Sequence, residues 1–85
     1  MSAKPKNVAA VYDNGGKTAD RYTIVLTYKE GPGMRMCLGL SRNPSHPQGY
    51  SEFGSCQMGR HLGKKIQWTK LPENIRKHAA ARVKE

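Results

Sequence analysis

Hydrophobic and polar residues alternate most regularly between Arg21 and Ser41. With a two-residue repeat, one face of an extended chain carries Tyr22, Ile24, Leu26, Tyr28 and, after Gly31-Pro32-Gly33, Met34, Met36, Leu38 and Leu40. The opposite face carries smaller or more polar residues that would meet water or a partner, namely Thr23, Val25, Thr27, Arg35, Cys37 and Gly39. The pattern predicts a β-hairpin with one apolar face, around which the rest of the chain is organised.

Shorter patterns on either side of this hairpin predict further elements. Residues 8–12 form a strand candidate that leads into an Asp13–Asp20 loop, where Asn-Gly and Gly-Gly favour a turn. Three consecutive strands then most simply form an antiparallel meander. Residues 65–69 alternate again, with Ile66 and Trp68 on one face. A helix near residues 72–83 carries a narrow apolar stripe of Leu71, Ile75, Ala79 and Val83.

Residues 42–63 have no sustained period and are rich in Gly and Pro, so the sequence predicts a long connection there. Tyr50 and Phe53 either anchor this connection on the sheet or belong to a binding surface. The predicted fold class is α+β, a small antiparallel sheet of three or four strands near 8–12, 21–28, 34–41 and 65–69 with one C-terminal helix. An SH3-like or chromo-like barrel is the closest analogy. Residues 1–7 are expected to be a disordered basic tail, and residues 8–85 a single small domain.

Charge is the main indication of function. Fifteen Lys and Arg against six Asp and Glu give a formal charge of +9, which favours an anionic partner, most commonly nucleic acid. A solubilising surface is the alternative. Lys70, Lys77 and Lys84, with Arg76, are expected on one basic face of the helix. The candidate nucleic-acid-binding residues all lie in the C-terminal third, and they are Arg60, Lys64, Lys65, Lys70, Arg76, Lys77 and Lys84. No recognition motif accompanies them, so binding would have low sequence specificity.

The sequence offers little catalytic or metal chemistry. Cys56 and His61 with His46 or Cys37 match no zinc spacing, and Asp13 and Asp20 lack the ligand spacing of a calcium loop. We therefore expect a non-enzymatic protein with no metal and no cofactor. Two cysteines do not make a disulfide framework, and no signal peptide or membrane span is evident. These features predict a cytoplasmic protein with reduced thiols and no membrane partner.

Three stretches carry a resemblance: residues 12–23 (YDNGGKTADRYT), 43–49 (NPSHPQG) and 61–72 (HLGKKIQWTKLP). With them the chain resembles small uncharacterised proteins of bacteria, bacteriophages and mobile elements. The resemblance implies an origin and no activity. It motivates a second hypothesis, a protein-interaction module that inhibits a host defence (anti-CRISPR-like) or another nucleoprotein complex. Such a module would dock through its two long loops, with candidate residues Asn14, Asp20, Arg42, Asn43, Tyr50 and Phe53.

Overall fold

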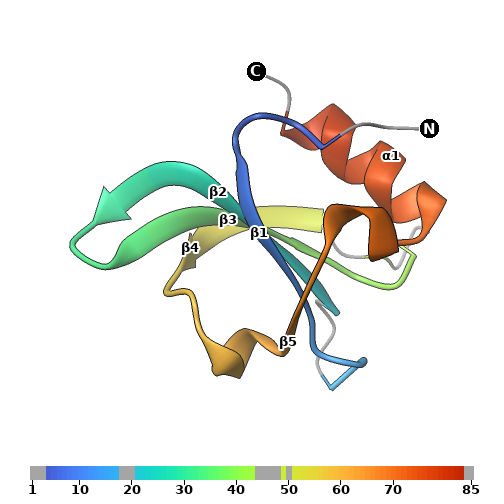
Figure 1. Ribbon diagram of the computed structural model, residues 1–85, viewed down its shortest axis with the longest axis horizontal. Coiled ribbons are helices and arrows are strands. Elements are labelled where there is room, and N and C mark those ends of the chain that lie inside the picture. The colour runs from blue at the N-terminus through green and yellow to red at the C-terminus, as the bar shows by residue number, and fades with distance from the viewer. Residues whose placement is uncertain (1–3, 18–20, 44–48, 50, 84–85) are drawn as a thin grey trace.

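The computed structural model describes residues 4–17, 21–43, 49 and 51–83. These residues form β1 (Val8–Asp13), β2 (Tyr22–Gly31), β3 (Met34–Leu40), β4 (Ser51–Cys56), the 3-10 turn η1 (Arg60–Leu62), β5 (Lys64–Ile66), the 3-10 turn η2 (Trp68–Lys70) and helix α1 (Glu73–Arg82). The strands make one antiparallel sheet in the order β4-β3-β2-β1-β5, and α1 lies across one of its faces (Figure 1). The predicted α+β class is therefore confirmed.

The sheet is open. Strands β1 to β4 follow one another as a meander, and β5 returns to pair with β1 from Val11 to Asp13. In the described part of the chain the two edge strands, β4 and β5, do not pair with each other. The described strands therefore form an open sheet and not the barrel of the SH3-like or chromo-like analogy.

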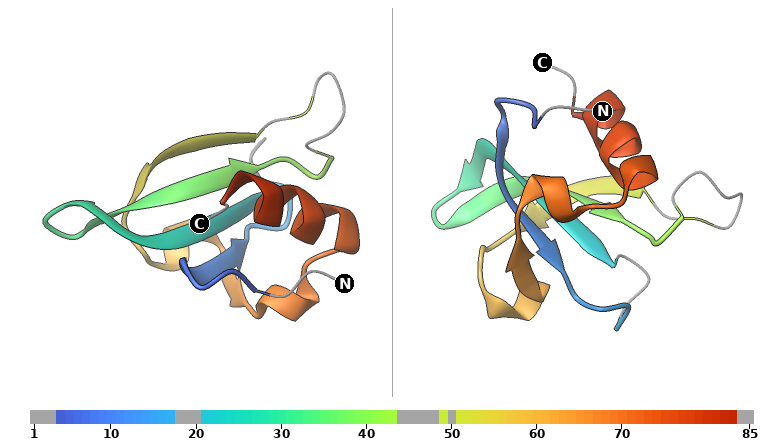
Figure 2. Two further views of the ribbon diagram at one scale, coloured as in Figure 1. Left: turned by 90° about the horizontal axis from the view of Figure 1, so that it is seen from above. Right: turned by 45° about the vertical axis from the view of Figure 1, so that its right-hand side comes forward.

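The β2–β3 hairpin supplies the centre of the sheet. Ile24, Leu26, Leu38 and Leu40 are completely or almost completely buried in the main core, as the two-residue repeat predicts. Tyr28, expected on the same buried face, is instead 50% exposed. The pairing register shifts between Val25 and Lys29, and the outer part of the hairpin extends beyond the region that α1 covers (Figure 2). The apolar face therefore ends before Tyr28.

The second face of the sheet is also covered, contrary to the expectation that it meets water or a partner. Val25 is completely buried and Cys37 nearly so. Val25 packs with Ala10 and Tyr12 of β1 in a second, smaller cluster, against which Cys56 and Leu62 lie. Leu62 belongs to η1, so the segment between β4 and β5 supplies part of this cover.

The prediction of one long connection over residues 42–63 was wrong, because residues 51–56 form strand β4 beside β3. This edge strand has a single large apolar residue, Phe53, and therefore no alternating pattern to detect. Phe53 packs against the main core, and the Arg82 guanidinium lies 5.0 Å from the centre of its ring. Phe53 thus anchors the segment on the sheet. Tyr50 lies outside the described residues.

The C-terminal third of the chain contributes the edge strand β5 to the sheet and then the helix α1, which packs on one face of the sheet. The predicted strand 65–69 is displaced to Lys64–Ile66, and Trp68 enters the main core from η2. The helical stripe of Leu71, Ile75, Ala79 and Val83 is buried as predicted. A hydrogen bond of 2.9 Å between His78 Nε2 and Ser51 Oγ links α1 to β4. Of the helices formed by described residues, none has both the length and the apolar character that crossing a membrane requires.

Asn7, assigned from the sequence to the tail, belongs to the packed structure. Its side-chain amide donates a hydrogen bond of 2.8 Å to the Val83 carbonyl at the end of α1. The main-chain carbonyl of Asn7 accepts a hydrogen bond of 2.9 Å from Thr27 N–H. The chain entering β1 is therefore tied to both the helix and β2. Residues 1–3 lie outside the described part.

Two neighbouring substitutions in β2 test the assignment of faces. Leu26→Asp places a carboxylate in the main core and should lower the free energy of unfolding by more than about 3 kcal/mol, whereas the exposed Thr27→Asp should change it by less than about 1 kcal/mol. Chemical denaturation of both variants measures the difference. Equal losses would contradict the assigned phase of β2.

Candidate nucleic-acid interface

The β1–β2 loop and the segment entering β5 meet in very close contact at Gly63. A Cβ atom at this position would lie 2.5 Å from both the Asp13 carbonyl oxygen and the Asn14 Cα, and the Gly63 φ of +108° is itself unfavourable for other residues. Glycine is therefore required for this contact. The contact places two nearby cationic residues, Lys64 and Arg60, beside the loop.

The loop itself is fixed by short side-chain bonds to its own backbone. Asp13 Oδ1 accepts a hydrogen bond of 2.8 Å from Gly15 N–H, and Asn14 Oδ1 accepts bonds from the N–H groups of Gly16 (2.8 Å) and Lys17 (3.1 Å). Such turns are the ordinary use of Asp and Asn in glycine-rich loops, as the sequence suggested. They place Lys17 on the same side as Arg60 and Lys64.

Among the described residues that line this region, Asp13 is the acidic one, and it is paired with Arg21. Arg21 Nε lies 3.0 Å from Asp13 Oδ1, and a second bond of 3.4 Å joins Arg21 Nη2 to Oδ2. Burial by itself would raise the pKa of Asp13, but the hydrogen bonds from Arg21 and Gly15 and the charge of Arg21 together hold that pKa below its ordinary value of 3.8. Asp13 therefore stays ionised and committed to Arg21.

A cleft of about 450 Å³ opens between the loop and β5. Its lining includes Asp13, which is paired with Arg21, and three exposed cationic residues, Lys17, Arg60 and Lys64. Neither of the two ion pairs found among the described residues involves these three side chains. We call this hollow, defined by Lys17, Arg60 and Lys64, the basic cleft.

Two residues of the basic helix face predicted from the sequence, Arg76 and Lys77, have partners within the fold. The Arg76 guanidinium donates hydrogen bonds to the carbonyls of Thr69 (3.1 Å) and Leu71 (2.5 Å), so it fixes the end of η2 against α1. Lys77 pairs with Glu73 at 3.3 Å, one helical turn away. Lys70 is exposed in η2, and Lys84 lies outside the described residues. Arg76 and Lys77 thus already make contacts within the fold, and a continuous basic surface on the helix stays a prediction.

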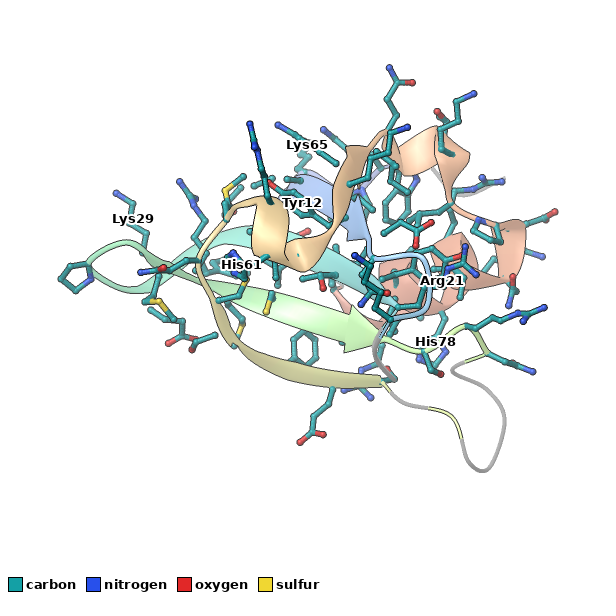
Figure 3. The ribbon with its side chains drawn as sticks, turned by 90° about the horizontal axis from the view of Figure 1, so that it is seen from below. Tyr12, Arg21, Lys29, His61, Lys65 and His78 are labelled. Atoms are coloured by element: carbon teal, nitrogen blue, oxygen red, sulfur yellow. The ribbon has the colours of Figure 1, made fainter. Side chains whose placement is uncertain are left out.

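Lys65 points to the other side of β5 from Lys64. It lies near Tyr12, well away from Arg21 (Figure 3). There it borders an apolar groove of about 570 Å³ between β1 and the segment Ile66–Thr69. The predicted residues Arg60 and Lys64 thus share one hollow, and Lys65 borders a second.

The other candidate residues do not converge. Arg42 and Asn43 are exposed beyond the end of β3 and do not line the basic cleft, while Asp20, His46 and Tyr50 fall outside the described residues. Cys37, Cys56 and His61 border a hollow of about 380 Å³ on the second face of the sheet, and no disulfide joins these two cysteines. Within the described ranges, no three His, Cys, Asp or Glu residues are grouped closely enough to hold a metal ion.

No family model, curated protein or solved structure matches this chain. The resemblance to small bacterial and bacteriophage proteins therefore stays a prediction. Two of the three stretches that carry it, residues 12–23 and 61–72, contribute residues to the basic cleft.

Replacing Asp13 by Asn tests the ion pair through its pH dependence. Asn keeps an oxygen for the Gly15 N–H but removes the charge that Arg21 contacts. Because the folded-state pKa of Asp13 lies below 3.8, its stabilisation is fully present above that value and is lost as pH falls through the lowered pKa. The wild type should therefore melt at a higher temperature than D13N at pH 7, and the two should converge as the pH falls below the lowered pKa of Asp13. A difference in Tm that does not change with pH would contradict the pairing.

Substitutions of the neighbouring residues Arg76 and Lys77 test whether Arg76 stabilises the fold while Lys77 does not. Arg76→Gln leaves carbonyls without charged donors and should cost about 1–3 kcal/mol of unfolding free energy. Lys77→Gln breaks only an exposed pair and should cost less than about 0.5 kcal/mol. Urea unfolding distinguishes them, and equal values would show that Arg76 has no structural role.

Proposed function

We propose that this protein is a non-enzymatic, cytoplasmic nucleic-acid-binding domain that contacts phosphates with low sequence specificity. The observation that carries the proposal is the basic cleft, where Lys17 meets Arg60 and Lys64 from a distant part of the sequence. The net charge of +9 supports the same class of partner.

The chemistry of the cleft suits phosphate groups. Lysine ammonium groups contact phosphate oxygens as point charges, and an arginine guanidinium adds a planar pair of donors. Since these three side chains have no carboxylate partner among the described residues, binding would not have to break an existing ion pair. Contacts of this kind position a nucleic acid without reading its sequence, which supports low specificity.

Strand β5 and its flanking turns carry this interface better than the helix does. Arg76 is occupied by backbone carbonyls and Lys77 by Glu73, whereas Arg60 and Lys64 face the cleft. Of the surface first expected from the sequence, we retain the strand part and not the helical part.

A protein-docking module is the second candidate, and a separate observation favours it. Met58 is 40% exposed and borders a hollow of about 410 Å³ at the β2–β3 turn, together with Met34, Lys29 and Arg35. Methionine and arginine are common in protein interfaces. As an inhibitor of a host nucleoprotein complex, the protein would use this end of the hairpin and not the loops first expected.

Two triple variants with the same loss of charge test the proposal. Lys17→Gln, Arg60→Gln and Lys64→Gln together remove the cations of the basic cleft, and Lys29→Gln, Lys70→Gln and Lys77→Gln remove three exposed cations elsewhere. Binding to an oligonucleotide of arbitrary sequence is measured by fluorescence anisotropy from about 50 to 200 mM salt. The cleft variant should bind at least about ten-fold more weakly, and its slope of log K against log salt should be shallower by about 2. The control variant should keep most of the affinity.

Absence of wild-type binding at about 50 mM salt would reject the proposal and favour the docking module. Equal losses in the two triple variants would show that net charge, and not the cleft, determines binding.

A further inference from the structure

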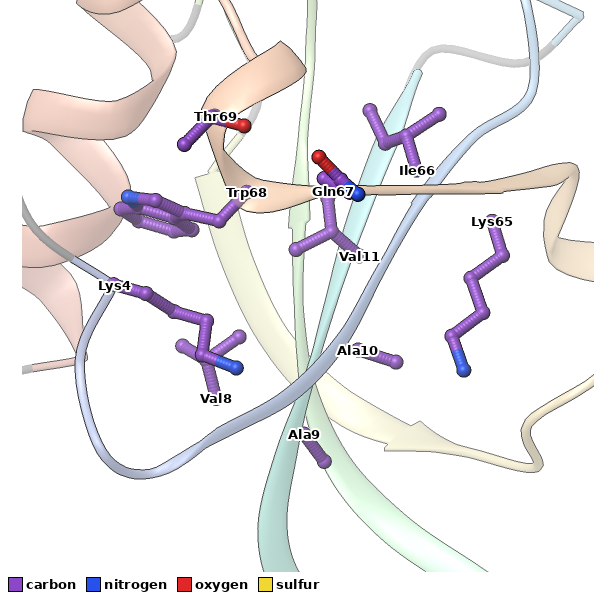
Figure 4. Close-up of a pocket in the computed structure, with 10 residues that line it drawn as sticks. All are labelled: Lys4, Val8, Ala9, Ala10, Val11, Lys65, Ile66, Gln67, Trp68 and Thr69. Carbon is purple, nitrogen blue, oxygen red and sulfur yellow. The ribbon is translucent and has the colours of Figure 1, made fainter.

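The apolar groove lies along an uncovered part of β1. Strand β5 accompanies β1 only from Val11 to Asp13, after which the chain turns away at Gln67 into η2. Along Val8–Ala10, no described strand pairs with β1 on the side away from β2. The space between this edge and Trp68 is the groove of about 570 Å³ (Figure 4).

Most of the groove surface is apolar, with cations at its borders. Val8, Ala9 and Ile66 contribute aliphatic surface, and the indole of Trp68 forms part of one side. Lys4 lies near Trp68 and Val8, and Lys65 lies on the opposite side (Figure 4). The volume falls within the range of about 300–1,000 Å³ in which small planar ligands bind. A neutral apolar ligand would make no use of the ammonium groups of Lys4 and Lys65. The groove therefore suits a ligand in which a planar apolar group is attached to anionic groups.

The groove and the basic cleft adjoin each other across β5. Ile66 borders both hollows, while the consecutive residues Lys64 and Lys65 serve one hollow each. An apolar site therefore lies beside a phosphate site, with a lysine next to each. This is the arrangement of a nucleotide unit, in which an aromatic base is attached to a charged backbone.

We infer that the groove accepts an unstacked base of a single strand whose backbone occupies the basic cleft, so that the protein prefers single-stranded nucleic acid to duplex. This inference rests on the proposed function. In a duplex the bases are paired and stacked on one another, so their faces are not accessible to an apolar hollow on a protein surface. In a single strand each base presents a face to aromatic and apolar side chains, and binding of this kind tolerates any sequence.

Three probes separate the base from the phosphates: a mixed-sequence single-stranded oligonucleotide, the same sequence as a blunt duplex, and inorganic polyphosphate. The single strand should bind about ten-fold more tightly than the duplex, which corresponds to the contact of one base. Trp68 is the only tryptophan in the chain, so its fluorescence reports on the groove. Its emission should change with the single strand and remain constant with polyphosphate.

Ala9→Phe fills the groove from an exposed position, and Ala81→Phe makes the same change at an exposed position of α1 that does not line the groove. Ala9→Phe should weaken single-strand binding about ten-fold and leave polyphosphate binding unchanged, whereas Ala81→Phe should alter neither.

If neither oligonucleotide nor polyphosphate binds the wild type, the proposed function fails. If all three probes bind with equal affinity, only the base site is overturned. This comparison uses the wild type alone, so it tests whether the groove accepts a base even if Ala9→Phe does not fold. Unchanged single-strand affinity in a folded Ala9→Phe variant would likewise overturn it.

Discussion

The return of β5 to β1 is the constraint on which both the fold and the candidate site depend. It requires Gly63, because any side chain there would collide with the backbone of Asp13 and Asn14. Once this contact is made, the chain is directed from the sheet edge through η2, so that Trp68 enters the core and α1 crosses the sheet face. The same contact brings Arg60 and Lys64 to Lys17. One short three-residue strand thus connects the packing of the core to the position of the charges.

The cationic residues divide into structural and available groups. Arg21 neutralises Asp13, Arg76 satisfies two carbonyls, and Arg82 lies over the Phe53 ring. Each of these arginines stabilises a junction between two segments. The exposed side chains of the basic cleft make no ion pair among the described residues, which is why binding is proposed there. These arginines keep their charge and still contribute to the net charge of +9, but their contacts within the fold restrict how freely their guanidinium groups can reach a partner.

The parts of the fold that sequence predicts are those with a strong apolar period. The stripe from Leu71 to Val83 and the pattern through Ile24, Leu26, Leu38 and Leu40 identify the helix and the central hairpin, because each residue contributes to one continuous core. Strand β4 escaped prediction because an edge strand with one large apolar residue has no period. The second covered face escaped because η1 comes from a remote segment whose position depends on tertiary contact.

The candidate site was predictable only in part, for similar reasons. The excess of basic residues from Arg60 onward indicates the segment that supplies two of the three cations of the basic cleft, but sequence does not show which cations are already bonded. Arg76 looks like a surface residue on a helical wheel and is in fact bonded to two carbonyls. Lys17 lies between two aspartates in the sequence, so its segment shows no excess of positive charge. The close contact at Gly63 places it in the cleft.

A map of backbone and indole N–H chemical shifts during titration with a single-stranded oligonucleotide tests the proposed interface most directly. Binding at the β1–β5 edge should produce the largest changes at Gly15, Lys17, Gly63 to Lys65 and the Trp68 indole, with little change from Lys77 to Arg82. Changes concentrated on α1, or on the β2–β3 turn around Met34 and Met58, would contradict an interface at the β1–β5 edge.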